Sequence, residues 1–147
     1  MNTLWRRVAL ALLALAGLFV GVWAAAAPRS FYDSFPSLGY HWIDLLPPFN
    51  EHLVFDVGTL QLGLAAGSLA AIVSRRALLG RLSGLTWFVF ALPHFAFHLA
   101  RLGPTMSDSI GQAVSTGLPV VLGLLLIPPP RVRVEADSPL EIKEIAR

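Results

Sequence analysis

Four long apolar stretches constrain what this chain can fold into. They cover about residues 8–27, 53–73, 82–100 and 110–127, and Asp56 is the only Asp, Glu, Lys or Arg side chain among them. A hydrocarbon core of about 30 Å is crossed by roughly 20 apolar helical residues. The sequence therefore predicts an all-α integral membrane four-helix bundle over residues 1–127, with kinked helices where Pro93 and Pro119 interrupt two of the spans.

The composition is typical of an integral membrane protein. Hydrophobic residues make up 55% of the sequence and charged residues 14%, whereas an average soluble domain carries about 25% charged residues. This balance argues against an ordinary soluble enzyme, a disordered chain and a nucleic-acid-binding surface. The sequence has no cysteine, which excludes disulfides, thiolate nucleophiles and cysteine-based zinc sites, so any metal site would have to use His, Asp and Glu.

The basic residues are distributed unevenly between the two sides of the predicted bundle. Nine of the eleven flank segments on one side: Arg6, Arg7, Arg75, Arg76, Arg81, Arg131, Arg133, Lys143 and Arg147. Because positive residues stay in the cytoplasm, both termini and the turn at 74–81 are expected there, with residues 28–51 outside. We expect a multi-pass protein of the cell membrane, whose basic residues reflect its topology and require no nucleic acid.

The first apolar stretch also resembles a secretory signal. Arg6 and Arg7 precede it, and Ala24 and Ala26 offer an A-x-A cleavage site. Signal peptides have an apolar core of about 7–15 residues, and the longer run here favours a retained helix. Both interpretations stay open at this point.

Two segments lie outside the predicted helices. The external loop 28–51 holds six aromatic residues among four prolines, which favours an interfacial belt or a lid over the bundle, with a ligand-binding surface as the alternative. Residues 128–147 begin with three prolines and then mix basic with acidic residues. This composition is typical of a solvated tail, here a cytoplasmic one.

The residues that could carry chemistry cluster near the outer ends of two helices. His52 and Asp56 are four residues apart, as are His94 and His98, so each pair lies on one face of its helix. An unpaired carboxylate in an apolar helix is costly, and we expect Asp56 to pair with His94, His98 or Arg101 between the helices.

The same donors would suit a transition metal. His52, Asp56, His94 and His98, with Glu51 as a further candidate, could bind zinc, iron or manganese. A haem with two axial histidines would need one from each helix, such as His52 with His94. The sequence lacks the HExxH pair of zinc proteases and the Glu-x-x-His pairs of di-iron bundles.

Small residues on the second predicted helix indicate close helix packing. Gly63 and Gly67 form a G-x-x-x-G step, and Gly80 with Gly84 repeats the spacing at the start of the third helix. Such steps let helix backbones approach each other. The motif serves packing within one chain and a homo-oligomer equally well.

Several of these motifs resemble a group of small, uncharacterised bacterial integral membrane proteins. The motifs are PRSFYDSFP at residues 28–36, His41-Trp42, Asn50-Glu51-His52-Leu53, Asp56-Val57-Gly58, and Pro93-His94 with His98. The resemblance covers about residues 5–127 and implies a four-helix membrane protein without an assigned chemistry. The overall layout is also loosely similar to that of DoxX-like membrane proteins, from which no function is transferred.

The sequence therefore favours a non-enzymatic structural or accessory bundle whose partners are the lipid bilayer and a membrane complex or second copy. In that role the external loop docks a partner or lipid. Two alternatives stay open: a metal- or haem-binding membrane protein, and a proton-linked small-molecule carrier in which Asp56 titrates with a histidine.

Overall fold

The computed structural model describes residues 3–129 of the chain. Over that range the chain forms α1 (Leu4–Ala26), α2 (Pro28–Ser34), β1 (Pro36–Ser37), β2 (Tyr40–His41), α3 (Glu51–Ser74), α4 (Ala77–Leu99) and α5 (Met106–Leu126). The strands form a small antiparallel hairpin in which Pro36 pairs with His41 and Ser37 with Tyr40. The predicted tail beyond residue 129 lies outside the described residues.

The all-α fold with four long helices is confirmed. The helices α1, α3, α4 and α5 are each long and apolar enough to cross a membrane. They differ from the predicted spans mainly at their ends: α4 begins five residues and α5 four residues before the predicted start. Arg81 and Asp108 lie in these added turns. The spans were predicted from stretches without charge, so they left out helical turns that contain a charged residue. Pro93 and Pro119 lie inside helices that continue on both sides.

Local sequence signals explain where the helices begin and end. At the start of α3, the Asn50 side chain accepts a hydrogen bond from the Leu53 backbone N–H at 3.1 Å. At the start of α5, Thr105 and Asp108 form a capping box, with 3.1 Å between the Asp108 N and the Thr105 Oγ1. Such caps satisfy the free N–H groups of a first helical turn. Arg75 ends α3 in a left-handed conformation with φ of 56°.

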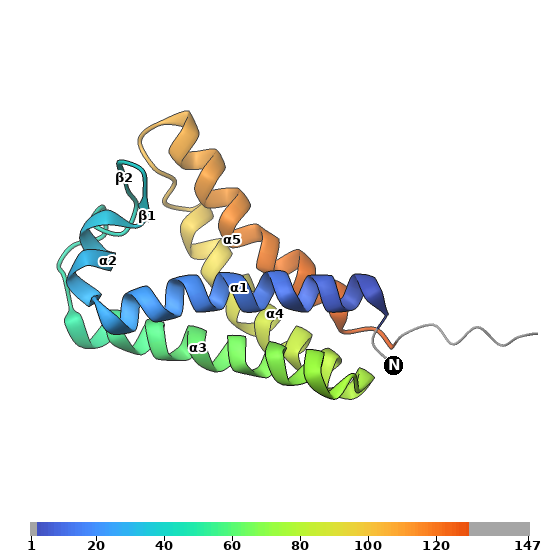
Figure 1. Cartoon of the computed structure of the whole chain (residues 1–147). Helices are drawn as coiled ribbons and strands as arrows, with labels where there is room; N and C mark the ends of the chain where they lie inside the picture. The colour runs from blue at the N-terminus through green and yellow to red at the C-terminus, as the bar shows by residue number, and fades with distance from the viewer. Residues whose placement is uncertain (1–2, 130–147) are drawn as a thin grey trace, which may run out of the picture.

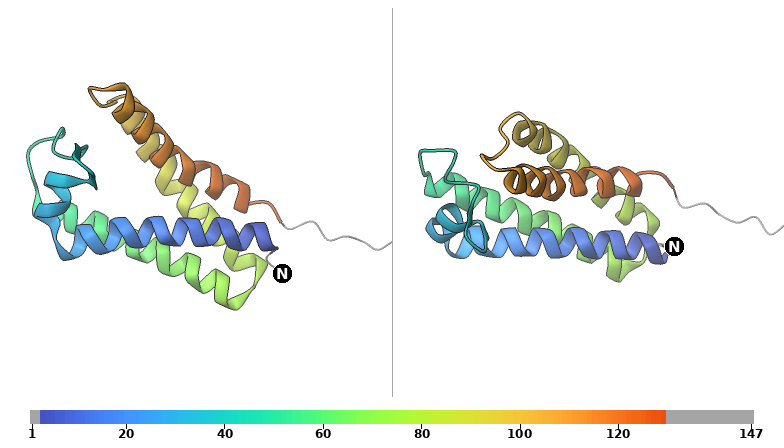
Figure 2. Two further views of the ribbon diagram at one scale, coloured as in Figure 1. Left: turned by 45° about the horizontal axis from the view of Figure 1, so that its top comes forward. Right: turned by 90° about the horizontal axis from the view of Figure 1, so that it is seen from above.

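The four long helices pack as two antiparallel pairs, α1 with α3 and α4 with α5 (Figure 2). Glycines set the close approach within each pair. A Cβ at Gly58 would lie 2.6 Å from the Ala25 backbone N, and a Cβ at Gly84 would lie 2.5 Å from the Leu126 Cβ. Gly63 and Gly67 have nothing within 4 Å of such a Cβ in the described structure. The G-x-x-x-G step singled out from the sequence is therefore not used for packing within the described residues.

The two pairs meet at one end of the bundle and diverge at the other (Figures 1 and 2). They meet near the N-terminus, which we call the terminal end, where buried Arg6 donates to the backbone oxygens of Leu126 and Pro128. Arg81 Nε donates to the Ile127 oxygen at 2.8 Å. They diverge at the loop end, where α2 and the hairpin lie. Arg6 thus ties the end of α5 to α1 of the other pair, and Arg81 ties it to α4.

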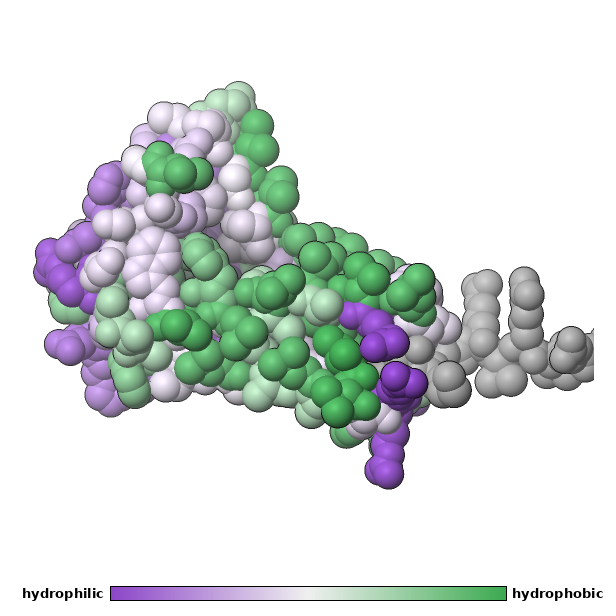
Figure 3. All heavy atoms as spheres, viewed as in Figure 1, coloured by the Kyte–Doolittle hydropathy of each residue, from purple (hydrophilic) through white to green (hydrophobic). Residues whose placement is uncertain are grey.

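The surface reflects the same division along the long axis. On the face seen in Figure 3, an apolar band covers the middle of the long helices, and hydrophilic residues gather at the loop end and near the N-terminus. Two hydrophilic ends separated by an apolar band are what a membrane-crossing bundle requires.

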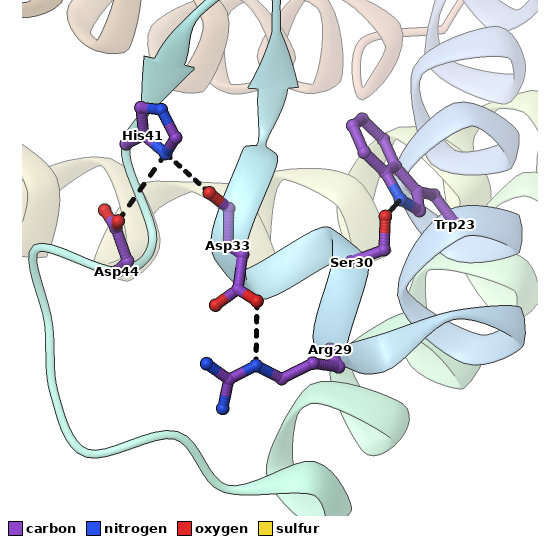
Figure 4. A network of polar contacts seen from close by, with 6 residues as sticks. All are labelled: Trp23, Arg29, Ser30, Asp33, His41 and Asp44. Carbon is purple, nitrogen blue, oxygen red and sulfur yellow. Dashed lines mark hydrogen bonds and ion pairs between the residues drawn. The ribbon is translucent and has the colours of Figure 1, made fainter.

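Residues 28–49, which we call the lid, are more ordered than the predicted interfacial loop. Trp23 on α1 packs edge-on against Phe31 with ring centroids 5.8 Å apart, and Phe31 and Tyr32 are buried. Figure 4 shows the polar contacts of this region. Asp33 accepts a hydrogen bond from Arg29 Nε at 2.7 Å, which raises the pKa of Arg29, and the Asp33 backbone oxygen contacts the His41 ring. The lid is thus a folded element attached to α1.

Candidate functional site

A cavity of about 650 Å³ lies between the diverging helix pairs at the loop end. All four long helices and the lid contribute to its wall. Pockets for small molecules and cofactors typically span about 300–1,000 Å³. The cavity is therefore large enough to hold a small molecule of ordinary size.

The inner end of the cavity is formed where the four helices converge, near Ala16, Gln61 and Trp87. Trp87 is 1% exposed, and its Nε1 donates to the Ser68 Oγ at 2.9 Å. The Ser68 Oγ is also 2.9 Å from the Ser83 Oγ. Because these contacts join α3 to α4, they fix the position of the Trp87 ring across the junction between the two helix pairs.

The lid covers the cavity and contacts both helix pairs. Phe35 and Trp42 of the lid line the cavity. Trp42 Nε1 donates to the Asp108 Oδ1 at 2.9 Å, and its ring lies against Gly111, where a Cβ would be 2.7 Å from the Trp42 Cζ2. Since the lid begins at the end of α1, Trp42 connects the α1–α3 side of the cavity to α5.

The wall of the cavity is largely apolar, is rich in aromatic rings, and has no charged side chain among the described residues that line it. The rings that line it belong to Phe19, Phe31, Tyr32, Phe35, Trp42, Trp87, Phe90 and Phe97. Polar lining groups include Asn50, Gln61, His94, His98, Gln112, Ser115 and Thr116. Among the described residues that line the cavity, none is Asp, Glu, Lys or Arg. An ionic group bound inside would lack a counter-charge in the lining.

Two glutamines in the lining are buried with unpaired amide oxygens. Gln61 on α3 is 8% exposed and Gln112 on α5 is 3% exposed. Their Oε1 atoms have no hydrogen-bond partner within the described part of the chain. Nearly all buried polar groups in proteins are hydrogen-bonded, and an unpaired one costs about 1–3 kcal/mol. These two amide oxygens are therefore free to accept a hydrogen bond from a group in the cavity.

The two histidines of α4 line this cavity. The rings of His94 and His98 contact each other with centroids 4.6 Å apart, and Phe90 stacks on His94 at 5.2 Å. The spacing in the sequence correctly predicted that both histidines share one face of their helix. That face of α4 is directed toward the cavity.

His52 and Asp56 lie on the exposed surface of α3. The His52 Nδ1 is 2.8 Å from the Asp56 Oδ2, and their side chains are 85% and 55% exposed. Neither residue lines the cavity, and Glu51 is also exposed. The predicted pairing of Asp56 with His94, His98 or Arg101 is wrong, because Asp56 pairs with His52 on its own helix. Arg101 instead stacks on Phe97, with 4.0 Å from its Cζ to the ring centroid.

The reason for this difference is the rotation of α3 about its own axis. Its buried face is formed by Val54, Gly58, Gln61, Ala65 and Ser68, which repeat at three- and four-residue intervals. Asp56 lies between these positions and therefore points outward. The length of a span does not determine this rotation.

The five candidate metal ligands are consequently divided between two places. Residues 3–129 contain no group of three or more His, Cys, Asp or Glu side chains that could hold a metal ion. The histidine pair considered for haem, His52 with His94, also does not flank the cavity, since His52 is outside it.

The sequence reasoning did not identify Gln112 or Trp42 as site residues, or that the lid and all four long helices together enclose the cavity. Gln112 could have been found by the argument applied to Asp56, since it is a polar side chain within a long apolar stretch. Nothing in the sequence pattern predicts the hydrogen bond between Trp42 and Asp108, because these residues are 66 positions apart.

No family model, curated protein or solved structure matches this chain. The resemblance described from the sequence motifs therefore stays a prediction, and functional inference depends on the cavity.

Proposed function

We propose that this is a non-enzymatic, multi-pass protein of the cell membrane that binds a small, largely apolar molecule in the cavity between its helix pairs. With both termini in the cytoplasm, as the distribution of basic residues favours, the loop end lies at the outer surface. The ligand would then enter from the outer leaflet or the outer surface.

The observation that carries this proposal is the aromatic cavity of about 650 Å³. Helices without a ligand gain contacts by packing together, as both pairs do at the terminal end. Between the diverging pairs the cavity is bounded at its inner end by the Ser68–Ser83–Trp87 contacts and at the loop end by Trp42 on Asp108. A space maintained by specific contacts supports a binding role.

The inward orientation of the lid supports binding over docking of a partner protein. Phe31 and Tyr32 are buried, and Phe35 and Trp42 line the cavity. An aromatic loop that docks a partner would present such rings outward. The lid's rings face the site, as they would in a cover that closes over a ligand.

The test uses tryptophan fluorescence with bromododecane, a neutral hydrocarbon whose bromine quenches indole on contact. Trp42 and Trp87 line the cavity, so a Trp5→Phe, Trp23→Phe background reports mainly on this site. In nanodiscs we expect quenching that saturates with probe concentration. Quenching that rises only in proportion to the probe dissolved in the lipid would contradict the proposal.

A matched pair of variants separates binding in the cavity from partitioning into the bilayer. Ala16 is an exposed residue of α1 that lines the cavity, whereas Ala66 is an exposed residue of α3 that does not. Ala16→Phe fills the site and is expected to abolish the saturable quenching. Ala66→Phe adds the same ring elsewhere and is expected to leave it unchanged.

A further inference from the structure

We infer that the bound molecule is uncharged and carries a hydroxyl group that donates a hydrogen bond to the amide oxygen of Gln61 or Gln112. This inference rests on the proposed function, since it specifies the ligand class of the same cavity. It follows from two properties of the wall: its lack of charge and its unpaired acceptors.

The lack of charge sets the first requirement. The described residues that line the cavity include no Asp, Glu, Lys or Arg, and a buried ion without a partner is strongly unfavourable. A carboxylate, phosphate or ammonium group would have to stay outside the cavity. The buried part of the ligand is therefore neutral.

The hydrogen-bonding state of the wall sets the second requirement. The Oε1 atoms of Gln61 and Gln112 accept no hydrogen bond from the described residues. The Ser115 and Thr116 hydroxyls on α5 are already used: Thr116 Oγ1 donates to the Gln112 backbone oxygen at 2.6 Å, and Ser115 Oγ donates to the same oxygen at 3.2 Å. An amide oxygen only accepts. A donor on the ligand satisfies either amide oxygen, and a hydroxyl is the neutral donor that an apolar molecule most simply carries.

The two glutamines belong to different helix pairs, so a bound ligand contacts both pairs. Gln61 belongs to the α1–α3 pair and Gln112 to the α4–α5 pair. A ligand that bonds to either amide and fills the aromatic space contacts both pairs. Its binding then adds contacts between the pairs at the end where the protein itself provides few.

The experiment compares three probes that share one chain and differ at one end: bromododecane, ω-bromododecanol and ω-bromododecanoic acid, the last at a pH where it is ionised. Each is titrated by tryptophan quenching, in the same nanodiscs, against the wild-type lining and a Gln61→Leu, Gln112→Leu variant. All proteins carry the Trp5→Phe, Trp23→Phe background.

We expect the alcohol to bind about tenfold more weakly to the double glutamine variant than to the wild-type lining, because a hydrogen bond to a buried acceptor is lost. Bromododecane should bind both proteins equally, which also shows that the variant is folded with its cavity intact. The ionised acid should bind at least tenfold more weakly than the alcohol.

Failure of this inference is distinguishable from failure of the proposed function. If bromododecane binds saturably but the alcohol has the same affinity for both linings, or if the acid binds as tightly as the alcohol, the hydroxyl assignment is wrong and the binding cavity stands. If no probe shows saturable quenching, or if Ala16→Phe does not remove it, the proposed function is wrong. The inference about the ligand class is then wrong as well.

Discussion

At the terminal end the two helix pairs meet through a buried arginine and backbone carbonyls, whereas at the loop end a cavity of about 650 Å³ separates them. The same four helices build both regions. Glycines allow close contact within each helix pair, and aromatic side chains line the space between the pairs at the loop end. Stability and binding are therefore assigned to opposite ends of one bundle.

This division explains why the cavity can exist in so small a protein. The contacts of Arg6 and Trp87 join the pairs without using the loop end, and Arg81 joins α4 to the end of α5. The loop end is then free to keep unpaired acceptors on Gln61 and Gln112. The comparison predicts that substitutions at the terminal end affect stability, while substitutions at the loop end affect mainly the lid and the ligand.

The largest effect is expected for Arg6→Leu. Arg6 is 1% exposed and donates to the backbone oxygens of Leu126 and Pro128. Its loss leaves these oxygens without their charged donor, which we expect to lower the free energy of unfolding by about 3 kcal/mol. Thermal melting in mild detergent measures the change.

Arg7→Leu is the matched control, because it removes the same charge from the neighbouring position. No hydrogen bond or ion pair of the Arg7 side chain occurs within the described residues, and its Nε is buried without a partner. We expect a change of less than about 1 kcal/mol. Equal destabilisation by both variants would mean that the stability depends on positive charge at the terminal end and not on the hydrogen bonds from Arg6 to the end of α5.

The next largest effect is expected for Gly84→Ala. The new Cβ would lie 2.5 Å from the Leu126 Cβ and 2.9 Å from the Gly123 oxygen, so α4 and α5 must separate. Overpacking of this kind costs about 2 kcal/mol. At Gly67 a Cβ meets nothing within 4 Å in the described structure, and Gly67→Ala should raise stability by up to about 1 kcal/mol through helix propensity. Urea or SDS titration of both variants provides the comparison, and equal costs would contradict it.

A smaller and local effect is expected for Trp42→Phe at the loop end. The variant keeps an aromatic ring but removes the 2.9 Å hydrogen bond to the Asp108 carboxylate, a charge-assisted contact. We expect faster hydrogen exchange in residues 36–46 with little change in the melting temperature. Tyr40→Phe, in the same hairpin, should leave exchange unaltered. Slower or unchanged exchange in the Trp42 variant would show that this bond does not hold the lid.

The smallest effect is expected for Asp56→Asn. The ion pair with His52 is exposed and joins residues four apart on one helix. Such pairs contribute about 0.5 kcal/mol or less. Melting curves should nearly coincide, and a large loss of stability would indicate that Asp56 has a partner across the bundle after all.

Much of the fold was predictable from the sequence, because each long helix is recorded in a local pattern. The apolar stretches predicted all four long helices. The spacing of His94 and His98 also predicted their shared face. These properties depend only on one helix at a time.

The site was not predictable, because it depends on how helices are rotated and inclined relative to each other. The glycine pattern did not distinguish Gly58, which packs against α1, from Gly63 and Gly67, where an added Cβ would meet nothing within 4 Å in the described structure. The length of α3 did not determine that Asp56 points outward while Gln61 points into the cavity. The divergence of the helix pairs results from many such contacts together.

The most direct test of the central claim is photolabelling of the intact protein in nanodiscs with a neutral long-chain alcohol that carries a diazirine, followed by peptide mapping. The account predicts that adducts concentrate on residues that line the cavity, such as Phe90, Ala91 and Gln112, and that excess ω-bromododecanol suppresses them. Adducts spread evenly over the exposed faces of the helices, with none in the lining, would show that the cavity does not bind such a molecule and would contradict the account.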